Sequence, residues 1–168
     1  MIDPAGYRAG VAIVLFNRQK KLFWAKRVNQ DAWQFPQGGM QEGETLRQTM
    51  YRELKEETGL DPDDVKIVTA SKQWLYYRLP KHLIRYRSEP LCIGQKQKWF
   101  LLKFVGEDSK FNFNASEKPE FDHWEWVNYW RPIKEVILFK KQVYHKALKI
   151  FAPYVFRRKE NSHHTISV

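Results

Sequence analysis

The sequence has little that would tie the chain together covalently or hold it in a membrane. It contains a single cysteine, Cys92, so no disulfide can form within the chain, which fits a reducing compartment. No apolar run approaches the roughly 18 residues of a membrane-spanning helix, and the first ten residues lack the charged and apolar segments of a signal peptide. We therefore expect a soluble, cytoplasmic protein that does not associate with a membrane.

Repeats and linkers are also absent, whereas the residues of a folded core are plentiful. Hydrophobic residues make up 43% of the 168 residues, with 7 Trp, 8 Tyr and 11 Phe. This composition excludes a chain that is disordered throughout, and the length suits one domain with a real core. We expect residues 1–156 to form that domain, which we take to be a monomer, and residues 157–168 to form a flexible tail.

The net charge of +10 is unevenly distributed. Residues 42–64 contain eight acids and three bases, whereas residues 71–103 contain eight bases and one acid, and residues 131–160 nine bases and two acids. A basic surround beside an acidic centre suits a polyanionic substrate longer than a mononucleotide. The alternative is that the positive charge serves solubility alone.

One helix is well defined by its ends. Thr45 and Gln48 have the spacing of a capping box, which predicts a helix beginning at Leu46. Gly59 suits the left-handed position after a helix, so the helix should end at Thr58.

Three acids of this helix, Glu53, Glu56 and Glu57, share one stripe. Met50 and Leu54 flank the stripe, so we expect it to face inward or into a groove. Like charges at this spacing repel, and burying them without partners would cost several kcal/mol. Divalent cations would compensate, and oxygen ligands favour Mg²⁺ or Mn²⁺, with several ions in one site. The alternative is a solvated acidic face.

The residues before the helix strengthen the first interpretation, because three glycines lie between Gly38 and Gly43. Glycine lets backbone groups approach a metal or phosphate closely. The whole stretch resembles the signature of the Nudix hydrolases, Gly-x5-Glu-x7-Arg-Glu-U-x-Glu-Glu-x-Gly-U, where U is a bulky aliphatic residue. Nine positions match without departure: Gly38, Glu44, Arg52, Glu53, Leu54, Glu56, Glu57, Gly59 and Leu60.

The remaining chain predicts strands around this helix. Val11–Phe16 and Leu22–Arg27 should form a hairpin, followed by a short strand at 33–35. Further strands are expected at 65–71, 74–78, 96–105 (a central strand) and 124–127. Helical spacing runs from Pro132 to Val143, and a second helical register continues to about Val155. The fold class is α/β, and the resemblance implies the Nudix α/β/α sandwich, a mixed, curved sheet between helices.

Other segments resemble one Nudix subfamily, the bacterial RNA pyrophosphohydrolases and dinucleoside polyphosphate hydrolases. They are Gly6–Arg8, Trp33–Gly39, Pro90–Leu102 and Pro119–Val127. The resemblance implies an enzyme that converts the 5′-triphosphate of RNA to a 5′-monophosphate, which would initiate mRNA decay. Dinucleoside polyphosphates are alternative substrates. A third interpretation, a non-catalytic RNA-binding module, is disfavoured because every acid of the signature is present.

The same resemblance implies roles for the acids. Glu53, Glu56, Glu57 and the Gly38 carbonyl would hold the metals, and Glu120 would supply a further carboxylate. Glu53 or Glu57 would activate the attacking water, and Arg52 would orient the acids by ion pairing, including Glu44.

Candidate substrate-binding residues lie elsewhere in the chain. The candidates for the phosphate chain and backbone are Arg8, Arg27, Lys98 and Lys140; each could also be an ordinary solvated cation, and Lys140 is expected to act as a screened point charge. A base could stack on Phe139, with Ile137 nearby, or on Tyr77. The alternative for Phe139 is a place in the helix core.

Overall fold

The computed structural model describes residues 1–157 and contains one mixed sheet. Five strands follow the order β3-β2-β1-β7-β5, and three more pair with this path: β4 with β1, β6 with β7 and β8 with β2. Among the strands of residues 1–157, only the central pair, β1 and β7, is parallel, over ten residues in register. The strands are β1 (Tyr7–Phe16), β2 (Leu22–Arg27), β3 (Trp33–Gln34), β4 (Gln37–Gly39), β5 (Val65–Ala70), β6 (Leu75–Arg78), β7 (Gly94–Phe104) and β8 (Phe121–Val127).

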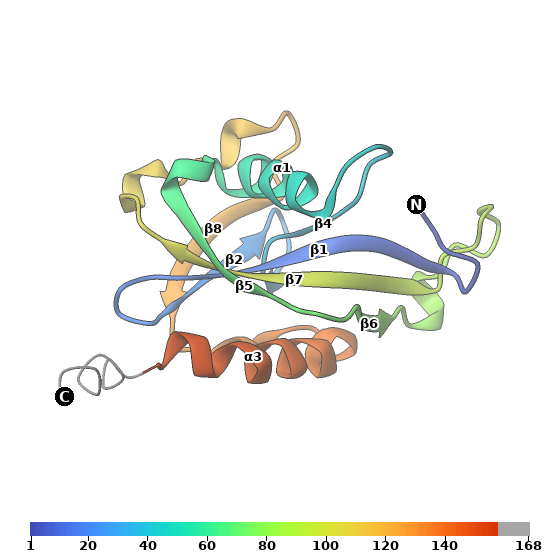
Figure 1. Cartoon of the computed structure of the whole chain (residues 1–168). Helices are drawn as coiled ribbons and strands as arrows, with labels where there is room; N and C mark the ends of the chain where they lie inside the picture. The colour runs from blue at the N-terminus through green and yellow to red at the C-terminus, as the bar shows by residue number, and fades with distance from the viewer. Residues whose placement is uncertain (158–168) are drawn as a thin grey trace.

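Helices cover both faces of this sheet, so the α/β/α sandwich is confirmed (Figure 1). α1 (Leu46–Thr58) lies on one face and α3 (Lys141–Val155) on the other, and a short α2 (Arg131–Glu135) precedes α3. Alternate residues of β1 and β7 point to opposite faces, and each face buries its own apolar core. Within residues 1–157, no helix combines the length and apolar character needed to cross a bilayer.

α1 begins and ends where the sequence predicts. The Thr45 side chain accepts from the Gln48 backbone N–H at 3.1 Å, and the Gln48 side chain accepts from the Thr45 N–H at 2.9 Å. Gly59 takes φ +80°, a left-handed conformation in which a side chain would be strained. Met50 and Leu54 are fully buried against the sheet, so packing and caps together fix the direction in which the acids point.

The prediction of continuous helical spacing from Pro132 to Val143 is wrong. α2 stops at Glu135, because Val136 and Ile137 adopt extended ψ angles of 150° and 141°. A single 3₁₀ turn, Leu138–Lys140, then leads into α3. Val136 is buried while Ile137 is 51% exposed, and such β-branched residues hold a helix weakly. The predicted flexible tail, residues 157–168, lies outside the described residues apart from Arg157.

Candidate active site

The site begins with a contact between the backbone of β4 and an acidic side chain of α1. Glu53 is buried, with 8% of its surface exposed, and its carboxylate lies against Gly38. A Cβ atom at position 38 would overlap that carboxylate, so any side chain there would displace the Glu53 carboxylate from its position. Glycine at this position therefore allows the Glu53 carboxylate to lie directly against the backbone of β4.

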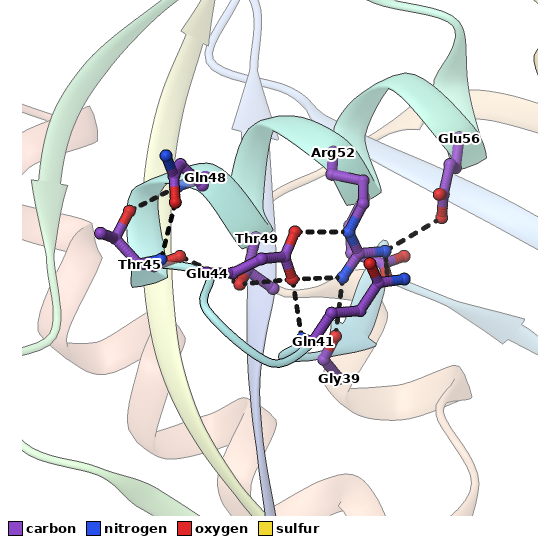
Figure 2. A network of polar contacts seen from close by, with 9 residues as sticks. Gly39, Gln41, Glu44, Thr45, Gln48, Thr49, Arg52 and Glu56 are labelled. Carbon is purple, nitrogen blue, oxygen red and sulfur yellow. Dashed lines mark hydrogen bonds and ion pairs between the residues drawn. The ribbon is translucent and has the colours of Figure 1, made fainter. Parts of the chain in front are cut away.

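Arg52 connects the loop before α1 to the acids of the helix (Figure 2). Its guanidinium donates to both carboxylate oxygens of Glu44, at 2.7 and 2.9 Å, and to the Gly39 carbonyl at 2.8 Å. Its Nη1 donates to Glu53 at 2.8 Å and to Glu56 at 3.2 Å. The two-pronged bond from Arg52 lowers the pKa of Glu44 to about 2. Arg52 thus forms ion pairs with Glu44, Glu53 and Glu56 at once; its role in orienting these acids stays a prediction.

Glu57 is buried as deeply as Glu53, but its negative charge has no ion pair like the one that Glu53 forms with Arg52. It is 7% exposed, and its Oε2 accepts from the backbone N–H of Gln37 at 3.1 Å. Burial raises the pKa of Glu57 well above its usual value, and the charges of Glu53 and Glu120 raise it further. Burial also raises the pKa of Glu53, although Arg52 opposes the change. Two neighbouring buried carboxylates repel each other, so a cation between them would be stabilising.

Glu56 and Glu120 lie at the rim of the site, where their side chains are 44% and 37% exposed. Glu56 is rotated 60° from Glu53 about the helix axis, so of the two expected directions, inward or into a groove, the inward one is wrong for Glu56. Glu56 pairs with Arg52, and Glu120, just before β8, lies 3.2 Å from Nε of Arg27. Among residues 1–157, no three acidic, histidine or cysteine side chains surround one point closely enough to hold an ion.

Two basic residues act on these acids, one of them from a buried position. Lys140 is only 7% exposed, and its Nζ donates to the side-chain oxygens of Gln34 at 3.3 Å and Gln37 at 3.4 Å. Burial lowers the pKa of Lys140 to about 8; the charge of Arg27 also lowers it, whereas Glu120 and Glu57 act in the opposite direction. Lys140 is therefore not the screened surface charge that we expected, because it is buried and bonded to two glutamines. Both partners lie more than 100 residues away in the sequence.

An aromatic group adjoins Lys140. The rings of Tyr77 and Phe139 lie 5.8 Å apart, and the Lys140 Nζ lies 5.6 Å from the first ring and 6.0 Å from the second. Tyr77 is buried and accepts from the Gln37 side chain at 3.3 Å. Phe139 is partly buried against the core beneath α3 and partly exposed. Its ring therefore contributes to packing and still offers a surface beside a cation.

Residues 6–148 match the family model described as the NUDIX domain. The chain belongs to the Nudix family. It is 52% identical over 161 residues to a protein of Hahella chejuensis named RNA pyrophosphohydrolase, covering 96% of this chain and all of that one. It is 57% identical over 148 residues to a protein of Hydrogenovibrio crunogenus of the same name, covering 88% and 90%.

The fold is also that of solved Nudix structures. The structure of the E. coli dihydroneopterin triphosphate pyrophosphohydrolase superposes with a TM-score of 0.67 at 20% identity, covering 86% of this chain and 98% of that one. At this identity the likeness concerns the fold.

Most of the residues expected at this Nudix site lie together, Arg8 lies at their edge with its side chain beside Gly39, and Lys98 stands apart. Arg8 is in register with Gln95 of β7, which is in register with Tyr77 of β6; Arg8 therefore shares a sheet face with Tyr77 at a distance of two strands. Lys98 points to the opposite face. Its Nζ donates to the Lys72 carbonyl and lies 5.4 Å from the Trp74 ring.

Two residues of the site were missed on sequence grounds. Gln34 and Gln37 both hold Lys140, and Gln37 also bonds to Glu57 and Tyr77. Both lie in the stretch that precedes Gly38. The sequence does contain a sign of this role for Gln34. It alternates with aromatic residues in a short strand, and a buried glutamine at such a position needs hydrogen-bonding partners.

Proposed function

We propose that this Nudix protein is an RNA pyrophosphohydrolase, which converts a 5′-triphosphate end of RNA to a 5′-monophosphate and releases pyrophosphate or two phosphates. The observation that carries the proposal is the pair of buried carboxylates, Glu53 and Glu57, with the cations Arg52 and Lys140 near them. A phosphoric anhydride needs both: acids for a metal and a proton, and cations for its phosphate oxygens. Relatives that are more than 50% identical carry the name of this activity.

Divalent metal use is general among Nudix hydrolases, and we propose Mg²⁺ or Mn²⁺ here. The donor set fits, because it consists of carboxylates and peptide oxygens, which hard cations prefer. Glu53 and Glu57 would hold the ions with the Gly38 carbonyl, and Glu56 and Glu120 would join them after leaving their arginines. Bound ions would polarise the phosphoryl oxygens and lower the pKa of the attacking water.

The side chains around the acids have separate tasks in this proposal. Glu53 or Glu57 accepts the proton of the attacking water, since both carboxylates lie at the centre of the site. Arg52 is a positioning residue, which fixes the loop through Glu44 and Gly39. Arg27 and Lys140 neutralise the phosphate chain, and release of Glu120 from Arg27 would make that guanidinium available.

In this proposal the aromatic group of Tyr77 and Phe139 binds a nucleobase near the 5′ end of the RNA. Phe139 and Ile137 expose apolar surface beside the Lys140 ammonium group, which suits stacking of a nucleobase next to its phosphate. Arg8 lies on the same face, two strands away from Tyr77. An RNA can contact this whole surface, whereas a dinucleoside polyphosphate presents a single base on each side of its phosphates.

The proposal is tested by assaying end-labelled triphosphate RNA and diadenosine tetraphosphate side by side with Mg²⁺ and with Mn²⁺. We expect conversion of the RNA to its monophosphate with a higher kcat/KM than that for the dinucleotide. A protein that hydrolyses only the dinucleotide would contradict the proposal. A protein that binds RNA without hydrolysing either substrate would instead be a non-catalytic module.

A further inference from the structure

A cavity of about 320 Å³ lies at one end of the sheet, away from the acids of α1. It is formed where the segment before β1 meets the loop between β6 and β7, which lie next to each other in Figure 1. A backbone hydrogen bond joins the two segments, because Ile93 donates to the Gly6 carbonyl at 2.8 Å, and a second closes the base of the loop, where Leu79 donates to the Ile93 carbonyl at 2.9 Å. The walls of the cavity are therefore tied to the sheet.

The lining combines apolar and cationic groups. Leu79 and Leu83 contribute apolar walls, and Arg8, Arg85 and Gln95 contribute hydrogen-bond donors. The volume lies in the range of about 300–1,000 Å³ that is typical of small-molecule sites, which share this mixture of apolar walls and few polar groups. The ion pairs formed among residues 1–157 include neither Arg8 nor Arg85. Both guanidinium groups are thus available for an anion or for the face of a base.

The cavity is connected to the candidate active site through the sheet. Arg8 and Gln95 line the cavity. Together with Tyr77 they form one row across the strands, because Arg8 lies beside Gln95 and Gln95 lies beside Tyr77. Neighbouring strands lie about 4.8 Å apart, so this row spans about 10 Å. Tyr77 in turn contacts Phe139. A strand of RNA that leaves the aromatic group along this row would reach the cavity with one of its next nucleotides.

We propose that this cavity binds a nucleotide of the substrate RNA downstream of the 5′ end, with its base against Leu79 and Leu83 and its phosphate on Arg85. The inference rests on the proposed function and names a subsite of it. The charge of the region supports this occupant, because residues 71–103 carry eight bases and one acid, and a polyanion gains from each cation along its path. The apolar walls distinguish a nucleotide from a bare anion.

Chain-length dependence provides the test, with two arginines of one loop as a matched pair. Arg85 lines the cavity, whereas Arg87, two residues later, lies outside its lining. Both are exposed, so replacing either by Gln removes the same charge with little effect on folding. The measured quantity is kcat/KM on triphosphate RNAs of two and of five nucleotides, with Mg²⁺ at one ionic strength.

We expect the wild-type enzyme to prefer the five-nucleotide RNA. Arg85→Gln should lower kcat/KM on that RNA by up to about fivefold, the effect of an exposed charge pair, and leave the two-nucleotide RNA unchanged. Arg87→Gln should preserve the preference. Equal losses in the two variants would overturn the proposal, because they would show diffuse attraction without a subsite.

Cys92 supplies a second readout that does not depend on turnover. Its side chain also lines the cavity, and its Sγ donates to the Gly94 carbonyl at 3.2 Å. Saturating five-nucleotide RNA with a 5′-monophosphate should slow alkylation of the thiol by iodoacetamide severalfold, while the two-nucleotide RNA should not. Unchanged alkylation in the presence of bound five-nucleotide RNA would contradict occupancy of the cavity.

The nucleotide subsite and the proposed function on which it rests would be contradicted by different results. If both RNAs are hydrolysed with equal kcat/KM and Cys92 is not protected, the cavity binds no nucleotide and the proposed function stands. If neither RNA is hydrolysed, the proposed function itself is wrong. Protection of Cys92 by diadenosine tetraphosphate to the same extent would also overturn the downstream assignment, since that compound has no downstream nucleotide.

Discussion

Two carboxylates of the Nudix signature, Glu44 and Glu57, have opposite environments. Glu44 receives two hydrogen bonds from Arg52 and others from the Gln41 backbone and the Thr49 hydroxyl, and its pKa is lowered to about 2, mainly by Arg52. Glu57 is buried with one backbone partner, and burial raises its pKa. The protein itself neutralises the negative charge of Glu44, whereas the charge of Glu57 requires a cation from outside the protein.

The difference separates structural from chemical roles within one motif. A carboxylate that is already paired gains little from a metal, whereas a buried and poorly paired one gains much. The loop around Glu44 is therefore expected to hold its shape without metal, and Glu57 to remain destabilising until a cation arrives. Each of the following substitutions tests one side of this comparison.

The largest effect is expected from neutralising the acids of the α1 stripe. Glu53→Gln, Glu56→Gln and Glu57→Gln should each reduce turnover of triphosphate RNA by about 100-fold or more, since metal binding and proton transfer depend on them. Their thermal stability without metal should hold or rise, because repulsion is removed. Near wild-type turnover in two of the three variants at saturating Mg²⁺ would rule out the metal-site assignment.

Removing Arg52 should produce the opposite pattern. Arg52→Gln leaves Glu44 and Glu53 without their cation and should lower the free energy of unfolding by about 3 kcal/mol, measured in urea without metal. The pKa of Glu44 is lowered from 4.5 to about 2, so the stabilisation is fully present above pH 4.5 and is lost as the pH falls towards 2.

The control for Arg52 is another arginine of the same helix. Arg47 is exposed on the side away from the acids, and Arg47→Gln should change stability by no more than about 0.5 kcal/mol. If the two substitutions destabilise the protein equally, the Arg52 network does not hold the loop.

The ends of α1 and the alternation of the strands could be predicted because they depend on neighbouring residues. Thr45, Gln48 and Gly59 determine the helix within its own segment, and β7 shows its central position by its apolar run. The buried position of Lys140 could not be predicted, because Gln34 and Gln37 hold it across the fold. The break at Val136 was missed because the apolar spacing continues across it, although the adjacent β-branched Val136 and Ile137 weaken a helix there.

Phe139→Ala is expected to weaken binding of triphosphate RNA by about 1–3 kcal/mol, the usual contribution of one base stacked on an aromatic ring. The loss should be smaller for diadenosine tetraphosphate, and kcat should change less than kcat/KM. Because Phe139 also packs against the core, circular dichroism melting is needed as a control. A large drop in melting temperature with equal losses on both substrates would identify Phe139 as a core residue only.

The smallest effect concerns pH. The pKa of Lys140 is lowered to about 8, so its positive charge is present below pH 8 and is lost above it. The kcat/KM for RNA should fall by up to about tenfold as the pH rises through 8, because a charged hydrogen bond to phosphate is lost. Lys140→Arg keeps the charge and should remove this decline. The same decline in that variant would assign it to another group.

The comparison between Glu44 and Glu57 is tested most directly by the Mg²⁺ dependence of the free energy of unfolding. The wild-type protein should gain stability as Mg²⁺ is added, by linkage to binding in the folded state. Glu57→Gln should start from equal or higher stability and gain little. If Mg²⁺ stabilises the Glu57→Gln variant as much as the wild-type protein, Glu57 does not hold the metal and the account of this site is wrong.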